Sequence, residues 1–480
     1  MPIEVVEARQ MSPSDRSTDR VYKSYRIRDY KFRTRFDYSK TFNYDDETNT
    51  IDLHFKLVGA NKDKTLVFLC GGPGDKNTRP EKEDPNDSVE FFLAKGYSIL
   101  YPDYRGTGDS QPSKDELDAL VNRNDTQGLY NTMARLMQRD IVHDLESVRL
   151  ALKIEKWTLF GQSFGTGVAV CYASWFPTSL TEVLGTGAII PAFAQSPSEV
   201  FENLFDRVKE ACDIYYSKDH YPQDIKKVKE IVKWLAKAGD EGIPISDGKV
   251  TAKMFLCLGR RLGKPSQFEE LHELVEKMAG WAKPDEFGGD PTRAKDLLDA
   301  EFRKADNWKV KTRPLYISLS EMQYCARQND VPNWAAKEVA GKKDEYWWVD
   351  CPTEDLPQKI DEKEKEKKGR SLYFSGEMVY PFFFDAYDVL KPYTDVADLL
   401  AKQGLKEDMY NSEALKKNTV QMTFLISEKD MYVDPKLSKK TADKIPKCNA
   451  AQVEDYYHAQ IRISPKEVLE KLWASRKNEL

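Results

Sequence analysis

The chain has 480 residues, of which 40% are apolar and 11% aromatic, enough for one large or two ordinary domains with a hydrophobic core. Its formal net charge of -6 gives no reason to expect a nucleic-acid partner, and no stretch approaches the roughly 18 apolar residues of a membrane span. The seven cysteines are scattered, odd in number and without a CxxC pair, which favours reduced thiols in a cytoplasmic protein and argues against a zinc site.

The first part of the chain, to about residue 190, is predicted to alternate strands and helices. Two early segments alternate apolar and polar residues as antiparallel strands do, and later apolar runs are typical of strands covered on both faces. The predicted strands are 22–38, 51–58, 65–70, 97–102, 157–160 and 180–187. Apolar residues at helical spacing predict helices over 133–152 and directly after Ser163. This order favours a mostly parallel sheet in an α/β domain.

From about residue 191 to 410 the strand signal disappears. Apolar stripes at helical spacing predict helices, among them 201–215 and 225–235. The charged run 361–370 is predicted to be a solvated loop or the end of a helix. A long helical stretch inside a sheet protein is expected to be an inserted cap.

Strands return near the C-terminus. They are predicted at 420–427 and 450–457, with a helix around 435–445 between them. We therefore expect one α/β core, made of residues 1–190 and 411–480, that carries a helical cap of residues 191–410.

The motif Gly-Gln-Ser-Phe-Gly places Ser163 where a predicted strand runs into a helix. One interpretation is a plain loop of small residues, because G-x-S-x-G also occurs by chance. The other is a nucleophile elbow, a strained turn that exposes the serine Oγ. A serine hydroxyl needs a base, an acid and oxyanion donors to act as a nucleophile, so the rest of the chain decides between the two.

His458 is the histidine best placed to act as the base. His54 lies in a predicted strand, His143 in a predicted helix, and His220 and His272 in the inserted helical region. Only His458 follows a core strand after the insertion, which matches the α/β-hydrolase order of serine, acid and histidine.

The acid is expected after the strand at 420–427. Asp430 follows this strand by a few residues, where its side chain can turn toward the sheet edge. Glu428 is the fallback, and Asp434, beside Pro435, is expected to cap a helix.

Two backbone N–H groups are the expected oxyanion donors. One belongs to Phe164, the residue after the nucleophile, and the other to Gly72 in "LCGGPGD", with Gly71 as the second choice. The alternative is a plain Gly-Pro turn. No metal or cofactor is implied.

The segments "LCGGPG", "PDYRGTGDS", "FGQSFGTG", "DMYV" and "YYHAQIR" together resemble the proline iminopeptidases (prolyl aminopeptidases) of the α/β-hydrolase superfamily, in their longer branch with an enlarged helical cap. The resemblance covers about residues 50 to 475. It implies an α/β-hydrolase fold, a mostly parallel doubly wound sheet with a large helical cap inserted late in the sheet. It also implies Ser163 as nucleophile, Asp430 as acid and His458 as base. The implied activity releases an N-terminal residue, proline, from a peptide with a free N-terminus through an acyl-enzyme.

Two cap segments also resemble the family. "LSEMQY" points to Glu321 and "SGEMVYPFFF" to Glu377 as the acidic groups that hold the free amine of the substrate. Without the resemblance, both are ordinary surface charges. Nearby aromatic residues either wall a proline-sized pocket or belong to the core: Tyr324, Tyr380, Phe382, Phe383 and Phe384. Cys70 stands where many family members have histidine, a departure outside the catalytic set.

Three alternatives stay open at this point. An esterase or amidase would use the same machinery without requiring a free amine, and a binding protein could keep the fold without catalysis. Acyl transfer to an acceptor other than water is the third. An epoxide or haloalkane hydrolase is disfavoured, because those enzymes have Asp where Ser163 stands. Neither nucleic acid nor membrane is an expected partner.

Overall fold

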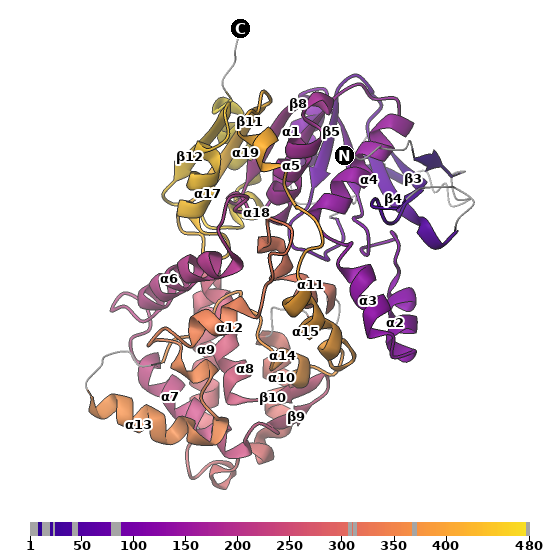
Figure 1. Cartoon of the computed structure of the whole chain (residues 1–480). Coiled ribbons are helices and arrows are strands. Elements are labelled where there is room, and N and C mark those ends of the chain that lie inside the picture. Colours follow the sequence, from indigo (N-terminus) through magenta and orange to yellow (C-terminus); the bar gives the residue numbers. More distant parts are fainter. Residues whose placement is uncertain are drawn as a thin grey trace.

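The computed structural model describes residues 8–11, 20–22, 25–40, 47–77, 88–305, 310, 314–366 and 372–476. Figure 1 shows a strand-rich part, built from both ends of the chain, and a helical part, built from its middle. Among the described helices, none combines the length and the apolar character that crossing a membrane requires.

Ten strands of the described ranges form one sheet, in the order β1-β3-β4-β6-β5-β7-β8-β11-β12, with β2 paired to β3. Their bounds are β1 Arg9–Gln10, β2 Arg20–Tyr22, β3 Tyr25–Arg35, β4 Thr50–Val58, β5 Thr65–Leu69, β6 Ser98–Pro102, β7 Trp157–Gln162, β8 Leu180–Thr186, β11 Gln421–Ser427 and β12 Cys448–Val453. The first four are antiparallel to their neighbours, and the run from β6 to β12 is parallel. The predicted mostly parallel sheet is confirmed.

The central parallel strands are largely apolar because helices cover both faces of the sheet. Leu66, Ile99 and Phe160 pack in one hydrophobic cluster with α1 (Ser88–Ala94) and α19 (Pro465–Ala474). Their chain neighbours pack in the other cluster, with α4 (Gln138–Ala151), α5 (Phe164–Trp175) and α17 (Pro435–Asp443). Successive side chains of a strand point to opposite faces, so one continuous apolar run serves both clusters.

The strand order places the loops that carry the predicted site side by side. β5 lies between β6 and β7, so the chain leaves β5 in one direction for β6 and later returns to its other side with β7. A crevice opens at the carboxyl ends of the strands at such a switch point. Gly71 and Gly72 follow β5, and Ser163 follows β7, so both loops border this crevice.

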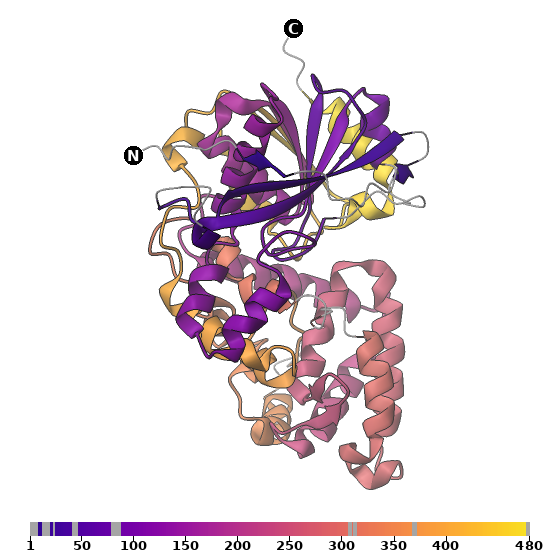
Figure 2. The same ribbon diagram turned by 90° about the vertical axis from the view of Figure 1, so that its right-hand side faces the viewer.

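The helical part is an insertion between two neighbouring strands, since β8 and β11 pair directly in parallel. Its helices are α6 Pro197–Tyr215, α7 Asp224–Leu235, α8 Ala252–Leu256, α9 Phe268–Trp281, α10 Lys295–Ala305, α11 Pro314–Leu319, α12 Ala335–Ala340, α13 Leu356–Lys365, α14 Phe383–Ala386, α15 Thr394–Gln403 and α16 Ser412–Leu415. Figure 2 shows this part beneath the sheet. The helices α2 (Lys114–Asn122) and α3 (Thr126–Met133) extend toward it, and the Tyr130 hydroxyl donates to the Gly404 carbonyl at 3.2 Å. The predicted boundaries at 190 and 410 stay a prediction.

Three element predictions need correction. The helix predicted over 133–152 starts later, because Met133 is the last residue of α3, Met137 is extended and α4 begins at Gln138. The inserted region also holds a short hairpin, β9 Ile243–Ile245 with β10 Gly248–Val250, too short for any periodicity to mark. The strand predicted at 450–457 is shifted, because β12 spans Cys448–Val453. The charged run ends α13 as predicted up to Lys365, and 367–370 lie outside the described residues.

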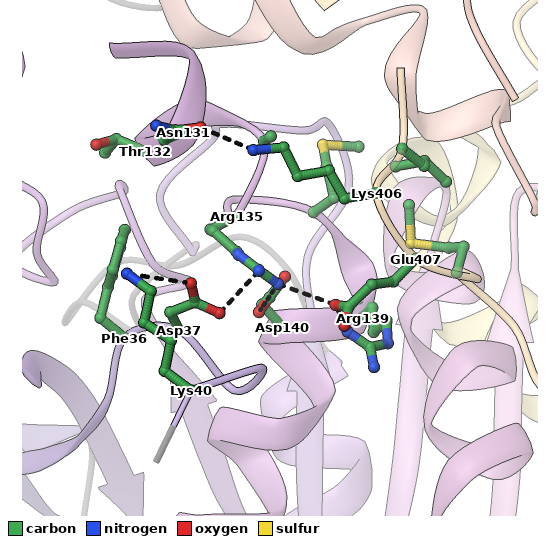
Figure 3. Close-up of a pocket in the computed structure, with 14 residues that line it drawn as sticks. Phe36, Asp37, Lys40, Asn131, Thr132, Arg135, Arg139, Asp140, Lys406 and Glu407 are labelled. Carbon is green, nitrogen blue, oxygen red and sulfur yellow. Dashed lines mark hydrogen bonds and ion pairs between the residues drawn. The ribbon is translucent and has the colours of Figure 1, made fainter. Parts of the chain in front are cut away.

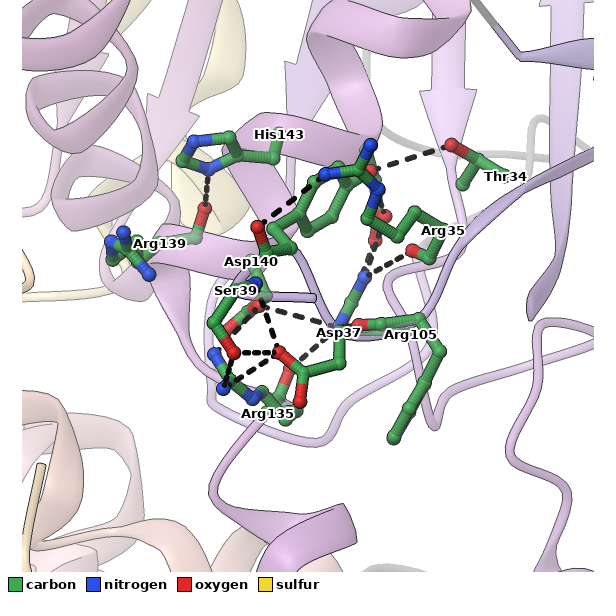
Figure 4. Close-up of polar contacts among 12 residues, drawn as sticks. Thr34, Arg35, Asp37, Ser39, Arg105, Arg135, Arg139, Asp140 and His143 are labelled. Atoms are coloured by element: carbon green, nitrogen blue, oxygen red, sulfur yellow. Dashed lines mark hydrogen bonds and ion pairs between the residues drawn. The ribbon is translucent and has the colours of Figure 1, made fainter. Parts of the chain in front are cut away.

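The segment "PDYRGTGDS" supplies the reason for the break between α3 and α4. The fully buried guanidinium of Arg105 forms a bidentate pair with Asp144, with both N–O distances 2.7 Å. It also donates to the carbonyls of Phe36 and Arg135. The Arg135 carbonyl therefore bonds to this side chain and not within a continuous helix. Figure 4 shows Arg105 among the charged residues that join the end of β3 to α4.

Candidate active site

Ser163 stands at a sharp turn between β7 and α5. Its φ of 55° and ψ of -122° lie outside the regions that L-residues readily adopt. The two motif glycines allow the turn to form. A Cβ on Gly165 would lie 2.1 Å from the carbonyl oxygen of Leu69, and one on Gly161 would lie 2.5 Å from the carbonyl oxygen of Gly165. The turn has the strain and the close packing of a nucleophile elbow.

The structure brings Ser163, His458 and Asp430 together in one hydrogen-bonded chain. His458 Nε2 lies 2.8 Å from Ser163 Oγ, and His458 Nδ1 lies 2.6 Å from Asp430 Oδ2. A carboxylate can only accept, so Nδ1 carries the donated proton and Nε2 of the neutral ring is free to accept from the serine hydroxyl. Asp430 is buried, and its Oδ1 accepts from the backbone N–H groups of Tyr432 and Val433 at 2.8 and 2.9 Å.

The expected oxyanion donors border the same cleft. Gly71, Gly72 and Phe164 all line it beside Ser163, and a Cβ on Gly71 would lie 3.0 Å from Ser163 Cβ. Phe164 is the first residue of α5, where N–H groups have no acceptor within the helix and the helix dipole favours negative charge. The roles of Gly72 and Phe164 stay predictions.

Glu377 reaches the cleft from the helical part. Its carboxylate accepts from Arg260 Nε at 3.0 Å and from Arg260 Nη2 at 2.7 Å, and the Tyr316 hydroxyl donates to it. The side chain is 19% exposed, and all three residues line the cleft. A substrate amine would therefore meet a carboxylate that is already paired with an arginine.

Glu321 does not line the cleft. It is buried, and its two oxygens accept from the backbone N–H groups of Ala335 and Ala336, at 3.1 and 3.0 Å, where α12 begins. Burial raises the pKa of this carboxyl to about 8, against the lowering effect of the two backbone hydrogen bonds. The structure thus places the two predicted amine-binding glutamates in different surroundings.

Other predicted residues fall as follows. Asp434 caps α17 by accepting from the N–H of Leu437, as expected, and the fallback acid Glu428 is not part of the hydrogen-bonded chain. His54 lies in β4 and His143 in α4, as predicted.

The aromatic residues of the cap divide between cleft and core. Tyr324 lines the cleft, whereas Tyr380, Phe383 and Phe384 are buried and Phe382 stacks on Tyr380. The alternative of ordinary packing therefore holds for four of the five.

Several residues that line the cleft were not singled out from the sequence, among them Arg260, Tyr316 and Tyr432. Arg260 and Tyr316 lie in the cap, and nothing in a single sequence distinguishes them from the other arginines and tyrosines of that region. Tyr432 could have been identified from the sequence, since it lies two residues after the predicted acid Asp430. It also contacts the base, with its ring centroid 5.1 Å from that of His458.

Two groups of the described residues have spacing that could suit a metal ion. They are His54 with Asp103 and Asp109, and Asp224 with His272 and Glu276. In the second group, the ammonium group of Lys227 pairs with both carboxylates, Asp224 and Glu276. None of these residues lines the cleft beside Ser163.

A second pocket lies apart from Ser163. It is lined by charged residues from the end of β3, the α3–α4 junction and the 405–409 segment, and Figure 3 shows Arg135 and Arg139 converging on Glu407 there. Asp140 is buried in the same cluster, and burial raises its pKa to about 6. None of Ser163, Asp430 and His458 lines this pocket.

Comparison with known proteins gives similarity over most of the chain. Residues 64–223 match the family described as alpha/beta hydrolase fold. The chain is 28% identical over 421 residues to the proline iminopeptidase aneH of Aspergillus aculeatus, covering 86% of this chain and 85% of the relative. It is 28% identical over 434 residues to a proline iminopeptidase of Aeromonas sobria, covering 89% and 92%. A proline iminopeptidase of Xylella fastidiosa is 30% identical over 163 residues, 32% of this chain and 44% of the relative.

The fold and the cleft define a hydrolase of the α/β-hydrolase superfamily. Within that superfamily, the chain is similar over most of its length to proline iminopeptidases.

Proposed function

We propose that this protein is a serine aminopeptidase that releases N-terminal proline from peptides. The observation that carries the proposal is the hydrogen-bonded chain from Asp430 through His458 to Ser163, which opens on a cleft that contains the acidic Glu377. The two long relatives, each named a proline iminopeptidase, support proline as the released residue. The seven cysteines, all free thiols, support a cytoplasmic location.

Catalysis proceeds through an acyl-enzyme. Ser163 Oγ attacks the carbonyl carbon of the N-terminal residue while its proton passes to His458 Nε2. Gly72 and Phe164 donate to the oxyanion, and one such donor is typically worth roughly 10²–10³ in turnover. His458 then gives the proton to the leaving nitrogen as the C–N bond breaks. Water repeats the attack and releases proline, with Asp430 holding the imidazole in one tautomer throughout.

Glu377 binds the free amine of the substrate. A hydrogen bond that involves a charged group contributes about 1.5–3 kcal/mol, a factor of roughly 10 to 150 in affinity. The negative charge of Glu377 has two roles: it attracts the substrate ammonium, and it offsets the positive charge of Arg260 beside it. Glu321, the other glutamate predicted to bind the amine, is not among the residues that line the cleft, so the cleft gives no similar support for that role.

An esterase or amidase is the second candidate, favoured by the pairing of Glu377 with Arg260, which lowers the net negative charge available to an amine. Proline arylamide, its N-acetylated form and a simple aryl ester distinguish the two, with Ser163→Ala as the blank. We expect cleavage of the free amide and little of the acetylated one. Ester cleavage that is indifferent to acetylation would favour the second candidate.

The amine anchor is tested with the same substrates. Glu377→Gln is expected to raise KM for proline arylamide by roughly ten-fold or more, because it removes the carboxylate charge that attracts the ammonium while the Arg260 cation stays in the cleft. Glu321→Gln serves as the comparison, and we expect a smaller effect on KM. A larger effect from Glu321→Gln would reverse the assignment.

A further inference from the structure

The charges along the cleft do not suit a substrate that carries only an ammonium group. Besides His458, the charged side chains that line it are Asp75, Arg260, Lys264, Glu377 and Arg462. Cations thus outnumber carboxylates, although an aminopeptidase must attract a cation. Complementary charge is what favours one ligand over another, so this lining suits a substrate that also carries a negative charge.

Arg462 is the cleft cation that the described residues leave without a partner. Arg260 is paired with Glu377, and both Asp75 and Lys264 have polar partners. The guanidinium of Arg462 makes no hydrogen bond or ion pair with any residue of the described ranges, and the side chain is exposed. Because an arginine fork binds carboxylates through parallel N–H donors, this side chain is available to an incoming carboxylate.

Arg462 also lies on the side of the cleft where the leaving group must be. His458 Nε2 has to reach the leaving nitrogen to protonate it, so the leaving residue lies beside His458. Arg462 follows four residues later, in α18 (Gln460–Ile463). Glu377 instead lies near the loop of the oxyanion glycines, since it bonds to Tyr316, whose Cε2 lies 3.3 Å from a Cβ built on Gly72.

Chain length decides which carboxylate can meet Arg462. In a single leaving amino acid, two bonds separate the protonated nitrogen from the carboxyl carbon, a distance of about 2.5 Å. Each further residue moves the C-terminal carboxylate outward by up to about 3.3–3.6 Å. The carboxylate of a dipeptide is therefore confined to the neighbourhood of His458, where Arg462 is.

We propose that Arg462 binds the C-terminal carboxylate of the leaving residue, so that the preferred substrates are dipeptides with N-terminal proline and a free C-terminus. The inference rests on the proposed function, because the leaving-group side is defined by catalysis at Ser163 and His458. Glu377 and Arg462, which line the same cleft, then match the two charges of a dipeptide zwitterion.

The test compares prolyl-alanine with prolyl-alanine amide, which differ only in the terminal charge. For the wild-type protein we expect kcat/KM to be roughly ten-fold or more higher for the free acid. Arg462→Gln is expected to bring this ratio close to one by slowing the free acid, and Arg462→Lys to keep part of it. Lys466→Gln, which removes an exposed cation from α19 outside the cleft, is the matched control and should keep the full ratio.

Proline arylamide separates the two proposals. If the wild-type protein cleaves the arylamide but treats the free acid and the amide alike, the dipeptide inference is wrong and the aminopeptidase function survives. A high ratio that persists in Arg462→Gln would overturn the assignment to Arg462. A folded protein that cleaves no proline substrate would overturn the proposed function itself.

Discussion

Gly165 shows how closely the turn at Ser163 is packed. The carbonyl oxygen of Leu69 lies 2.1 Å from where a Cβ of residue 165 would be, and it belongs to the backbone of β5, which cannot move without disturbing the sheet. Gly165→Ala is therefore expected to lower Tm by several degrees or to prevent folding, whereas Ser163→Ala should keep Tm and lose turnover. Thermal unfolding followed by circular dichroism, beside an activity assay, measures both.

Gly280→Ala is the matched control, because Gly280 lies in α9 and a Cβ there meets nothing within 4 Å. Alanine is the better helix former by about 1 kcal/mol, so Tm should stay or rise. A Gly165→Ala protein as stable as wild type would show that the elbow tolerates a side chain and that the close approach to Leu69 is not required.

Chain order predicted which residues meet at Ser163, but not what surrounds them. In a parallel sheet, residues just after successive strands gather at one edge, so Asp430 and His458 could be matched to Ser163 from the sequence. The surroundings of Glu321 depend on where α12 packs, and the exposure of Glu377 on where the cap lies. Those contacts join residues distant in sequence, and no periodicity records them.

At the scale of elements, apolar spacing predicted helices and strands but not their interruptions. Met133 and Leu152 share the apolar spacing of one predicted helix, yet α3 and α4 are separate because the Arg135 carbonyl accepts from Arg105. That bond comes from another loop and leaves no mark on local spacing. The hairpin of β9 and β10 has three residues in each strand, which is too few to show alternation.

The segment between α15 and α16 links α4 to the cap. Its Glu407 binds Arg135 Nη1 at 3.0 Å and also pairs with Arg139, in the charged pocket of Figure 3. Backbone bonds at Leu405 and Met409 join the same segment to residues 326–330. The partly buried ion pairs of Glu407 therefore connect α4, which packs on the sheet, to residues 326–330 of the cap. These residues follow Tyr324, which lines the cleft.

Glu407→Gln is expected to lower the free energy of unfolding by about 1–2 kcal/mol and Tm by a few degrees, since two largely buried guanidinium groups lose a shared carboxylate. Thermal melts at low and high salt measure it. Glu413→Gln is the control, because its pair with Lys416 is exposed and should contribute little. Equal effects of the two changes would contradict a role for Glu407 as a link.

At the scale of the whole molecule, the cleft is shared between sheet and insertion. Ser163 and His458 come from the ends of sheet strands, and Arg260 and Glu377 come from the helical part that lies against that edge in Figures 1 and 2. The insertion enters between neighbouring strands, so it reaches the catalytic edge without breaking the sheet. In the proposed mechanism, the sheet therefore supplies the chemistry and the insertion supplies the carboxylate that selects the substrate amine.

Buried Glu321 makes the stability of the whole molecule depend on pH. Its pKa is raised by burial from 4.5 to about 8, so the folded protein holds a proton that the unfolded chain releases between these values. Its contribution to stability is therefore full below pH 4.5 and is lost as pH rises toward 8. His143 and Asp140, with pKa values of about 3 and about 6, have little further effect on stability above pH 7.

We expect Tm of the wild type to fall by a few degrees from pH 6.5 to 8.5, because Glu321 loses its proton in this range. Glu321→Gln should flatten this fall whatever its effect on Tm at a single pH, whereas Glu470→Gln, on the exposed face of α19, should leave the slope unchanged. An unaltered slope in Glu321→Gln would show that another group titrates in this range.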